Sequence, residues 1–566
     1  LTTRIAGNSE VARAKKMATA DKIPDDEWRL DDGSDEPEPQ PAPPPPVVAA
    51  NLSAERLARA VYVVTIEHLA WYVVAGYALV TRMAALGARP LDPAPARDAL
   101  AAFYIAAHGR AAFALADASW VTILEGWIFG AAGANDANAR IVVTLCGLIL
   151  VAAAFAMRPV LGRAGALAFG SMVAISPSLT YFTRGCSTAI ASVTFMIVAI
   201  AIAESMRRRP TITRALGLGA AIALWLTADS IGYVTAAAMV GSLLLVGAVD
   251  AIRLDHRRLR LRVWWDRRRL QVIVGAIVAI GLWLVLTTAF FHRPLVAAVE
   301  YFADAAFAPP AIAVHRATHA LVPILVFYEF IAVKLALFGI FAIVTRRVGD
   351  RFATWALAWA IVSLAIAASI SANRADVVVA IIVPLAIVGA YAVDWMHRSE
   401  RWRSIRYAIA GVIGLTLYVQ LVVNFVYPAP DVSEAPWRRH ALLFWSEPAT
   451  SIQTVRECAR ARNAVPPAGA TAMVPDDAPQ VQWYLRDYTP TASPGGASIV
   501  VTLGQTRSGS LAANPDAPQF GFEESCTPNF RALTPAAVIS YLLTQRAWSE
   551  VEIRDLQIVT VPAKAP

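Results

Sequence analysis

Six ionisable side chains occur close together in one loop of an otherwise apolar chain. They lie between residues 85 and 138 and are Asp92, Arg97, Asp98, His108, Arg110 and Asp117. A carboxylate held beside a membrane can take a proton from an acceptor hydroxyl while an arginine stabilises a phosphate leaving group. The set would suit sugar transfer from a lipid carrier, whereas loop charges of this kind are more often simply solvated.

The elements around this loop are apolar stretches long enough to cross a bilayer. Hydrophobic residues make up 57% of the 566 residues and charged residues 16%, with a mean hydropathy of +0.50, which excludes an ordinary soluble protein. A spanning helix needs roughly 17 to 25 apolar residues. The sequence predicts eleven spans, at residues 59–84, 139–157, 164–183, 187–206, 212–228, 231–252, 270–291, 319–345, 352–371, 376–395 and 405–427.

A twelfth apolar piece, residues 120–134, is short and carries Glu125, so we expect it to be re-entrant or to lie at the membrane interface. The predicted fold class is therefore mainly α, a polytopic membrane protein with 11 to 12 transmembrane helices. Glu67, His68, Glu329 and Lys334 lie inside predicted spans. Each needs a partner or a function there, and pairing between helices is the simpler interpretation.

Clusters of arginine between the spans indicate the orientation of the chain. They occur at residues 207–209, 253–269, 346–351 and 397–406, and loops with such clusters stay in the cytoplasm. With eleven spans, the loop 85–138 and everything after Tyr427 then lie outside. We expect a multi-pass protein of a prokaryotic plasma membrane whose C-terminal domain is extracytoplasmic.

Three segments differ in composition. Residues 1–54 include a proline run and predict a disordered cytoplasmic tail without a signal-peptide pattern, so the first span should act as the membrane signal. Residues 55–428 form the predicted membrane domain. Residues 429–566 return to a mixed composition and predict a small α/β domain, with helices at 454–462 and 535–545 and strands at 470–474, 498–502 and 551–561.

Composition also limits the partners. The formal charge of +8 does not indicate nucleic-acid binding, because the arginines lie in short clusters between apolar runs. Histidines and cysteines show no metal-ligand spacing, so neither a metal site nor a cofactor is identified, and the loop carboxylates do not by themselves specify magnesium. Cys458 and Cys526, both in the C-terminal segment, either form a disulfide or remain two thiols.

Six short segments follow one another in the order found in a known family. They are RMAALGARPL at 82–91, a segment at 129–140 ending in NDANAR, Ser176-Pro177 with Tyr181 to Arg184, His315-Arg316 with Tyr328-Glu329, residues 373–393, and WYLRDY at 483–488. In this order the chain resembles membrane glycosyltransferases of the GT-C class, which includes protein O-mannosyltransferases and lipid A aminoarabinose transferases. The resemblance covers most of residues 55–505 and is closest to a subgroup described as flippase activity-associated.

The resemblance implies a site in which several reactive positions have changed. The acidic pair of the family falls at Ala94 and Pro95, and its Lys-Xaa-Pro-Trp element is reduced to residues 373–376. Asp92 and Asp98 flank the missing pair, and a shifted loop would present one of them as the catalytic base; Asp98 is equally well explained as the N-cap of a helix over residues 98–107. The resemblance implies substrate-binding roles for Asp117, Arg184, His315, Arg316, Glu329 and Arg374, although Arg184 also suits an interfacial anchor.

Three functions compete. The first is a glycosyltransferase of the cell envelope that transfers a sugar from a polyprenyl-phosphate-linked donor to an acceptor protein or glycan on the outer face. The second is a catalytically silent relative that binds the lipid-linked sugar or a partner enzyme, which would explain the lost acidic positions. The third is a transporter or lipid flippase, against which the absence of a repeat between the two halves of the sequence argues.

Overall fold

The structure is a computed structural model. It describes residues 66–113, 119–252, 258–297, 299–300, 325–345, 350–370, 375–398, 405–426, 447–448, 455, 469–476, 478–493, 497–508, 519–526, 534–544 and 551–560. The predicted tail 1–54 and most of the predicted helix 454–462 lie outside these residues, as do Asp117, His315, Arg316, Arg374 and Cys458. The side chain of Cys526 is also outside the description, so the disulfide stays a prediction.

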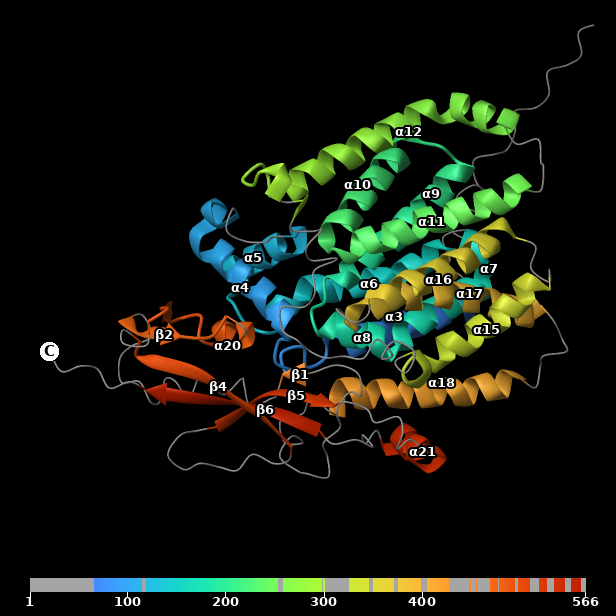
Figure 1. Ribbon diagram of the computed structural model, residues 1–566. Helices are drawn as coiled ribbons and strands as arrows, with labels where there is room; N and C mark the ends of the chain where they lie inside the picture. Colours follow the sequence, from blue (N-terminus) through green and yellow to red (C-terminus); the bar gives the residue numbers. More distant parts are fainter. Residues whose placement is uncertain are drawn as a thin grey trace, which may run out of the picture. The chain divides into compact units, whose positions relative to one another are not determined.

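Helices dominate the described chain (Figure 1). In chain order they are α3 (Ile66–Met83), α4 (Pro93–His108), η1 (Gly109–Phe113), α5 (Trp120–Ala132), η2 (Asn138–Arg140), α6 (Ile141–Ala156), α7 (Arg158–Ile175), α8 (Pro177–Arg184), α9 (Ala189–Arg208), α10 (Ile212–Ala228), α11 (Ile231–Ile252), α12 (Arg258–Thr287), α15 (Phe330–Val344), α16 (Arg351–Ile370), η3 (Ala375–Val377), α17 (Val378–Arg398), α18 (Ile405–Leu421), the π-helical η5 (Val422–Val426), α20 (Pro479–Tyr484) and α21 (Pro535–Thr544).

The mainly helical, multi-span architecture is confirmed. Among the described residues, six helices are long and apolar enough to cross a membrane, namely α6 with η2, α9, α11, α12, α16 and α17, and the bent pair α7 and α8 would be a seventh. The shorter apolar helices α10, α15 and the second part of α18 fall within further predicted spans, and α5 corresponds to the short apolar piece at residues 120–134. Several predicted spans, among them 59–84 and 319–345, lie only partly within the described residues.

The predicted span 164–183 is two helices that meet at an angle of 54°. The break lies at Ser176, whose hydroxyl accepts a hydrogen bond from the backbone N–H of Leu179 at 3.1 Å and so caps α8. Pro177 follows as the first residue of α8, where a missing N–H costs nothing. The same proline would break the hydrogen bonds of a continuous helix, which explains the bend.

The helix of the first loop begins earlier than the sequence indicated. α4 starts at Pro93, so Asp92 occupies the N-cap position and Asp98 lies in the second turn. The interpretation of Asp98 as an N-cap is therefore wrong. A proline at the first helical position is compatible with helix geometry and fixes the start of α4 there.

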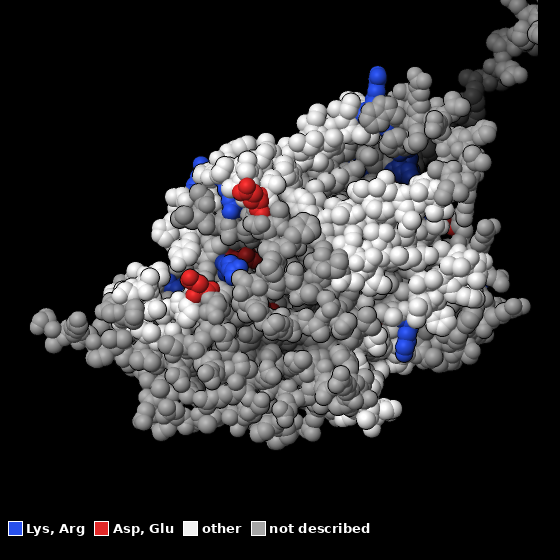
Figure 2. All heavy atoms as spheres, in the orientation of Figure 1, with Lys and Arg blue, Asp and Glu red and all other residues white. Residues whose placement is uncertain are grey.

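Close approach of backbones holds the helices together. A Cβ atom added to Gly219 of α10 would overlap the carbonyl of Gly275 in α12, and one added to Gly339 of α15 would overlap the carbonyl of Val388 in α17. Small residues at such contacts are typical of helix packing in membranes, where apolar surface alone does not drive association. On the face that Figure 2 shows, most of the described surface is uncharged. Large apolar side chains of the helices, Leu244 among them, are exposed.

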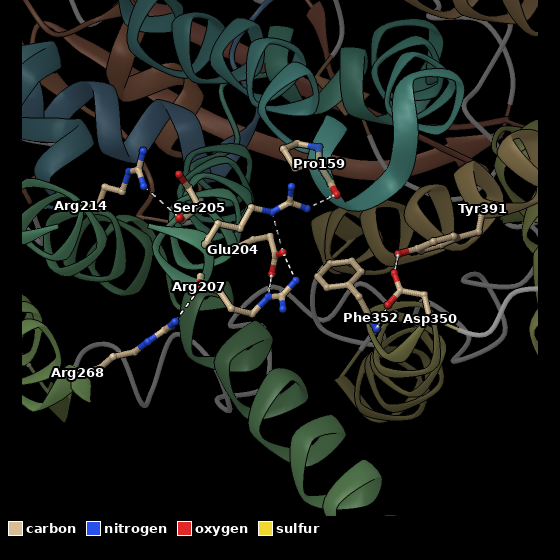
Figure 3. A network of polar contacts seen from close by, with 10 residues as sticks. Pro159, Glu204, Ser205, Arg207, Arg214, Arg268, Asp350, Phe352 and Tyr391 are labelled. Carbon is tan, nitrogen blue, oxygen red and sulfur yellow. Dashed lines mark hydrogen bonds and ion pairs between the residues drawn. The ribbon is translucent and has the colours of Figure 1, made fainter. Parts of the chain in front are cut away.

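Charged residues gather where α9 ends and where α10 and α16 begin, beside Arg268 within α12 (Figure 3). Arg207 donates two hydrogen bonds to Glu204, at 2.8 and 2.6 Å, and its own carbonyl accepts one from Arg268 at 2.7 Å. Asp350 accepts from the backbone N–H of Phe352 and from the hydroxyl of Tyr391. These contacts fix the helix ends opposite those that carry the first loop, and we call them the arginine end.

The C-terminal residues form a six-stranded mixed sheet with the order β1-β5-β6-β4-β2-β3. The strands are β1 (Glu447–Pro448), β2 (Thr471–Met473), β3 (Thr489–Pro490), β4 (Ile499–Ser508), β5 (Gln519–Cys526) and β6 (Val551–Thr560). β2 pairs in parallel with β3 and β4, and the other pairs are antiparallel. β2, β4, β6 and α21 occur where the sequence predicted them, whereas β5 and α20 were not anticipated.

Candidate functional site

A carboxylate with an arginine partner stands at the start of α4. Asp92 Oδ1 lies 3.7 Å from Arg89 Nη2, and the Asp92 side chain is 22% exposed. The Arg89 guanidinium stacks on the ring of Tyr181 at 4.1 Å and also donates a hydrogen bond to its hydroxyl. This arrangement places a partly exposed carboxylate beside an arginine, which suits a general base.

The end of α8 lies beside this carboxylate. A Cβ atom added to Gly185 would be 3.5 Å from Asp92 Oδ2. Arg184, one residue earlier, is 6% exposed, and its guanidinium stacks on Phe425 at 4.4 Å. The structure therefore brings Asp92 and Arg184 to one place, as expected for residues that share a site.

The guanidinium of Arg184 is nevertheless occupied by the protein itself. It donates to the carbonyls of Thr81, Ala84 and Ala85 at 3.1, 2.5 and 3.2 Å. These carbonyls belong to the last turn of α3 and the residues that follow it, where helix geometry leaves them without partners. Arg184 thus caps the C-terminal end of α3. Its hydrogen-bond donors bind these carbonyls, so it acts on the site through its positive charge.

A second buried arginine, Arg140, holds the loop that carries Arg89. It is fully buried and donates to the carbonyls of Leu86, Arg89 and Pro90 at 2.7, 2.6 and 2.9 Å. Arg184 experiences the charges of both Arg140 and Arg89, so three guanidinium groups lie within electrostatic range of one another, and Arg89 among them pairs with Asp92. Such a cluster favours an anion such as phosphate.

Asp98 has a different environment. Its charge acts on Glu125 of α5, a thirteen-residue helix, and on the thiol of Cys186. Glu125 is 1% exposed, and Cys186 Sγ lies 3.5 Å from its Oε1. Burial, reinforced by Asp98, raises the pKa of Glu125 well above its usual range. Asp98 therefore lies within electrostatic range of a second carboxyl group, that of Glu125.

Glu329 was expected in the site but lies elsewhere. Its Oε1 accepts hydrogen bonds from Ser176 Oγ at 2.7 Å and from the backbone N–H of Ser178 at 3.0 Å, both at the N-terminus of α8. Arg184 lies at the other end of this eight-residue helix, about 12 Å away along its axis. Glu329 thus stabilises the broken span, since carboxylates favour helix N-termini.

The sequence missed Arg89, Arg140 and Tyr181 as parts of this region. The motifs 82–91 and 135–140 include both arginines, so motif order was the signal that would have found them. Four expected substrate-binding residues, Asp117, His315, Arg316 and Arg374, lie outside the described residues, and their roles stay predictions. Within the described ranges, no three His, Cys, Asp or Glu side chains come close enough to hold a metal ion.

Comparison with known proteins places the fold. No protein family model and no curated protein matches the sequence. The structure is similar to that of ArnT from Cupriavidus metallidurans in the apo state, with 13% identity, a TM-score of 0.53, and coverage of 85% of this chain and 97% of ArnT. A second ArnT structure, bound to undecaprenyl phosphate, gives 13% identity, a TM-score of 0.51, and coverage of 88% and 98%. The chain therefore has a GT-C-like membrane fold, as the motif order predicted.

Proposed function

We propose that this protein is a membrane glycosyltransferase that transfers a sugar from a polyprenyl-phosphate-linked donor to an acceptor on the outer face of the membrane. The observation that carries the proposal is the partly exposed carboxylate of Asp92, which pairs with Arg89 on a GT-C-like scaffold. In this role Asp92 accepts the proton of the acceptor hydroxyl as the new glycosidic bond forms. The donor phosphate leaves with the electrons of the broken bond.

Asp92 suits the part of the base better than Asp98. Arg89 lies within reach of Asp92 and stabilises its charged form, which is the form that accepts a proton. Asp98 acts electrostatically on the buried acid Glu125, whose pKa it helps to raise. Asp92 also follows the loop that Arg140 holds, whereas Asp98 lies in the second turn of α4.

The positive charges suit a phosphate-bearing lipid. Arg89, Arg140 and Arg184 share one region, and the bend between α7 and α8 places that region at the end of a candidate span. One of the ArnT structures of similar fold contains undecaprenyl phosphate, which supports the same class of lipid here. The narrower subgroup, the sugar, the acceptor and the outward orientation belong to this proposal.

The test uses purified full-length protein in nanodiscs with a panel of undecaprenyl-phosphate-linked sugars, following release of undecaprenyl phosphate. Asp92→Asn should lower the rate by at least about 100-fold, because loss of a general base typically costs 10²- to 10⁴-fold. Asp98→Asn, in the second turn of the helix that Asp92 precedes, is the matched acid-to-amide control and should retain activity within about threefold. Full activity of Asp92→Asn would exclude Asp92 as the base.

One observation favours a second candidate, a catalytically silent relative that binds lipid-linked sugar. Arg184 spends its hydrogen bonds on the carbonyls of residues 81–85, whereas a phosphate-contacting arginine needs free donors. This candidate predicts saturable binding of undecaprenyl phosphate by the wild type without turnover of any donor in the panel. Turnover that requires Asp92 would reject it.

A further inference from the structure

A carboxylate far from the candidate base joins the C-terminal region to the first loop. Asp136 lies between α5 and η2, and its Oδ1 accepts a hydrogen bond from Trp483 Nε1 at 2.7 Å. Its Oδ2 accepts one from the hydroxyl of Tyr484 at 2.8 Å. Both oxygens of one carboxylate thus bind neighbouring residues of α20, nearly 350 positions later in the chain.

The surroundings of these two aromatic residues are closely packed. Trp483 is fully buried and Tyr484 is 5% exposed, and the ring of Trp483 packs on that of Phe129 at 5.7 Å. Arg486 stacks on Trp483 at 4.0 Å and donates to the carbonyl of Ala134 at 2.7 Å. α20 also packs against α4. Desolvation of this kind strengthens a hydrogen bond and makes its loss costly.

A short series of contacts connects Asp136 with the candidate base, Asp92. Arg140 follows Asp136 by one helical turn, and its Nη1 lies 3.4 Å from the Asp136 carbonyl. The same guanidinium donates to the carbonyls of Leu86, Arg89 and Pro90. Arg89 then pairs with Asp92. Each step joins rigid, mostly buried groups, so a displacement of Asp136 is transmitted to the loop.

We propose that Asp136, Trp483 and Tyr484 are positioning residues that use the C-terminal region to set the place of Asp92. The inference rests on the proposed function, in which Asp92 accepts the acceptor proton. They act on Asp92 through Arg140 and the loop 86–92, whose Leu91 backbone also contacts Tyr484. Burial and the charge of Asp136 raise the pKa of Tyr484, which keeps its hydroxyl a donor at all physiological pH values.

The first arm of the test measures order in the loop. Tyr484→Phe removes one hydroxyl donor and Asp136→Asn removes the charge, while Asp476→Asn, at an exposed position near β2, is the matched acid-to-amide control. Hydrogen exchange of residues 84–92 should rise about tenfold in Tyr484→Phe and Asp136→Asn and stay unchanged in the control, because local opening becomes easier. Faster exchange confined to residues 479–490 would overturn the proposal.

The second arm separates positioning from simple stability. With an active donor, Tyr484→Phe and Asp136→Asn should each lower kcat about tenfold with little change in donor KM. Asp136→Glu, which keeps the carboxylate, should retain part of the activity that Asp136→Asn loses. An unchanged kcat would overturn the proposal, as would a loss of kcat that follows the fall in Tm equally in every variant. If the wild type turns over no donor but exchange in 84–92 still responds, the proposed function fails and the mechanical connection stands.

Discussion

Arginines at the two ends of the helices differ in their exposure to solvent and in the groups they bind. Around the candidate site, Arg82, Arg140 and Arg184 are 1%, 0% and 6% exposed and donate to backbone carbonyls. At the arginine end, the side chains of Arg207 and Arg398 are 68% and 71% exposed and pair with carboxylates of their own helices. Arginine thus caps helix ends in one region and forms exposed ion pairs in the other.

The difference shows what a guanidinium does where hydrocarbon excludes water. A carbonyl at the end of a buried helix has no water to bind, and its loss of a partner costs several kcal/mol in an apolar medium. Arg82 donates hydrogen bonds to the carbonyls of Val173 and Ala174 at the end of α7, and Arg184 donates to a carbonyl at the end of α3. The buried arginines near span ends therefore have a structural role as hydrogen-bond donors to helix carbonyls.

The largest effect is expected when a buried arginine is removed. Arg140→Met would leave three carbonyls without donors and should lower the free energy of unfolding by about 3 to 5 kcal/mol. Thermal unfolding of the purified protein in detergent measures this. A stability equal to that of the wild type would contradict the structural role of Arg140.

The thiol of Cys186 offers a second test of burial near the site. Burial, together with the charge of Glu125, raises the pKa of Cys186 well above its usual range, so the reactive thiolate is scarce at neutral and mildly alkaline pH. Iodoacetamide should modify native Cys186 more than about 100-fold more slowly than in unfolding detergent, with rates read by mass spectrometry. Rapid native labelling at pH 8 would show that Glu125 and Cys186 are accessible.

A smaller effect is expected at the broken span. Glu329→Ala removes the acceptor for Ser176 and Ser178 and should destabilise the protein by about 1 to 2 kcal/mol, while Glu329→Gln, which keeps one oxygen, should cost less than about 1 kcal/mol. Melting temperatures of the two variants measure the difference. If Glu329→Gln loses donor binding while its stability is kept, Glu329 contacts substrate after all.

The smallest effect is expected at the arginine end. Arg398→Gln breaks an ion pair with Asp394, 2.6 Å long but formed by an exposed arginine, and should change stability by less than about 0.5 kcal/mol. The same melting assay at low and high salt checks this. A loss as large as that of Arg140→Met would erase the distinction between the two ends.

Much of the helical scaffold was predictable because the thickness of the bilayer sets the length of the apolar stretches that cross it. The predicted bounds of α10 and α11 agree with the structure to the residue, and the prediction for α5 is wrong only by two residues at its end. The break at Ser176 was not predicted, although Pro177 marks it, because the apolar pattern continues through it. An apolar pattern predicts that a segment is buried, but it does not show where the helix bends.

The site was less predictable because its contacts are distant in sequence. Asp92 lies beside Gly185, the residue after Arg184, yet nothing in the sequence around Arg184 shows that its partners are carbonyls about 100 residues earlier. Asp136 gave no signal beyond its motif, since its partners Trp483 and Tyr484 belong to another region. Such pairings depend on the folded chain, which local patterns do not specify.

The central claim is that Asp92, and not Asp98, activates the acceptor. The most direct test compares single-turnover sugar transfer by Asp92→Asn and Asp98→Asn with equal binding of undecaprenyl phosphate verified for each. The account predicts a rate at least about 100-fold below that of the wild type for Asp92→Asn and a nearly unchanged rate for Asp98→Asn. The reverse ranking, or equal rates in all three proteins, would contradict it.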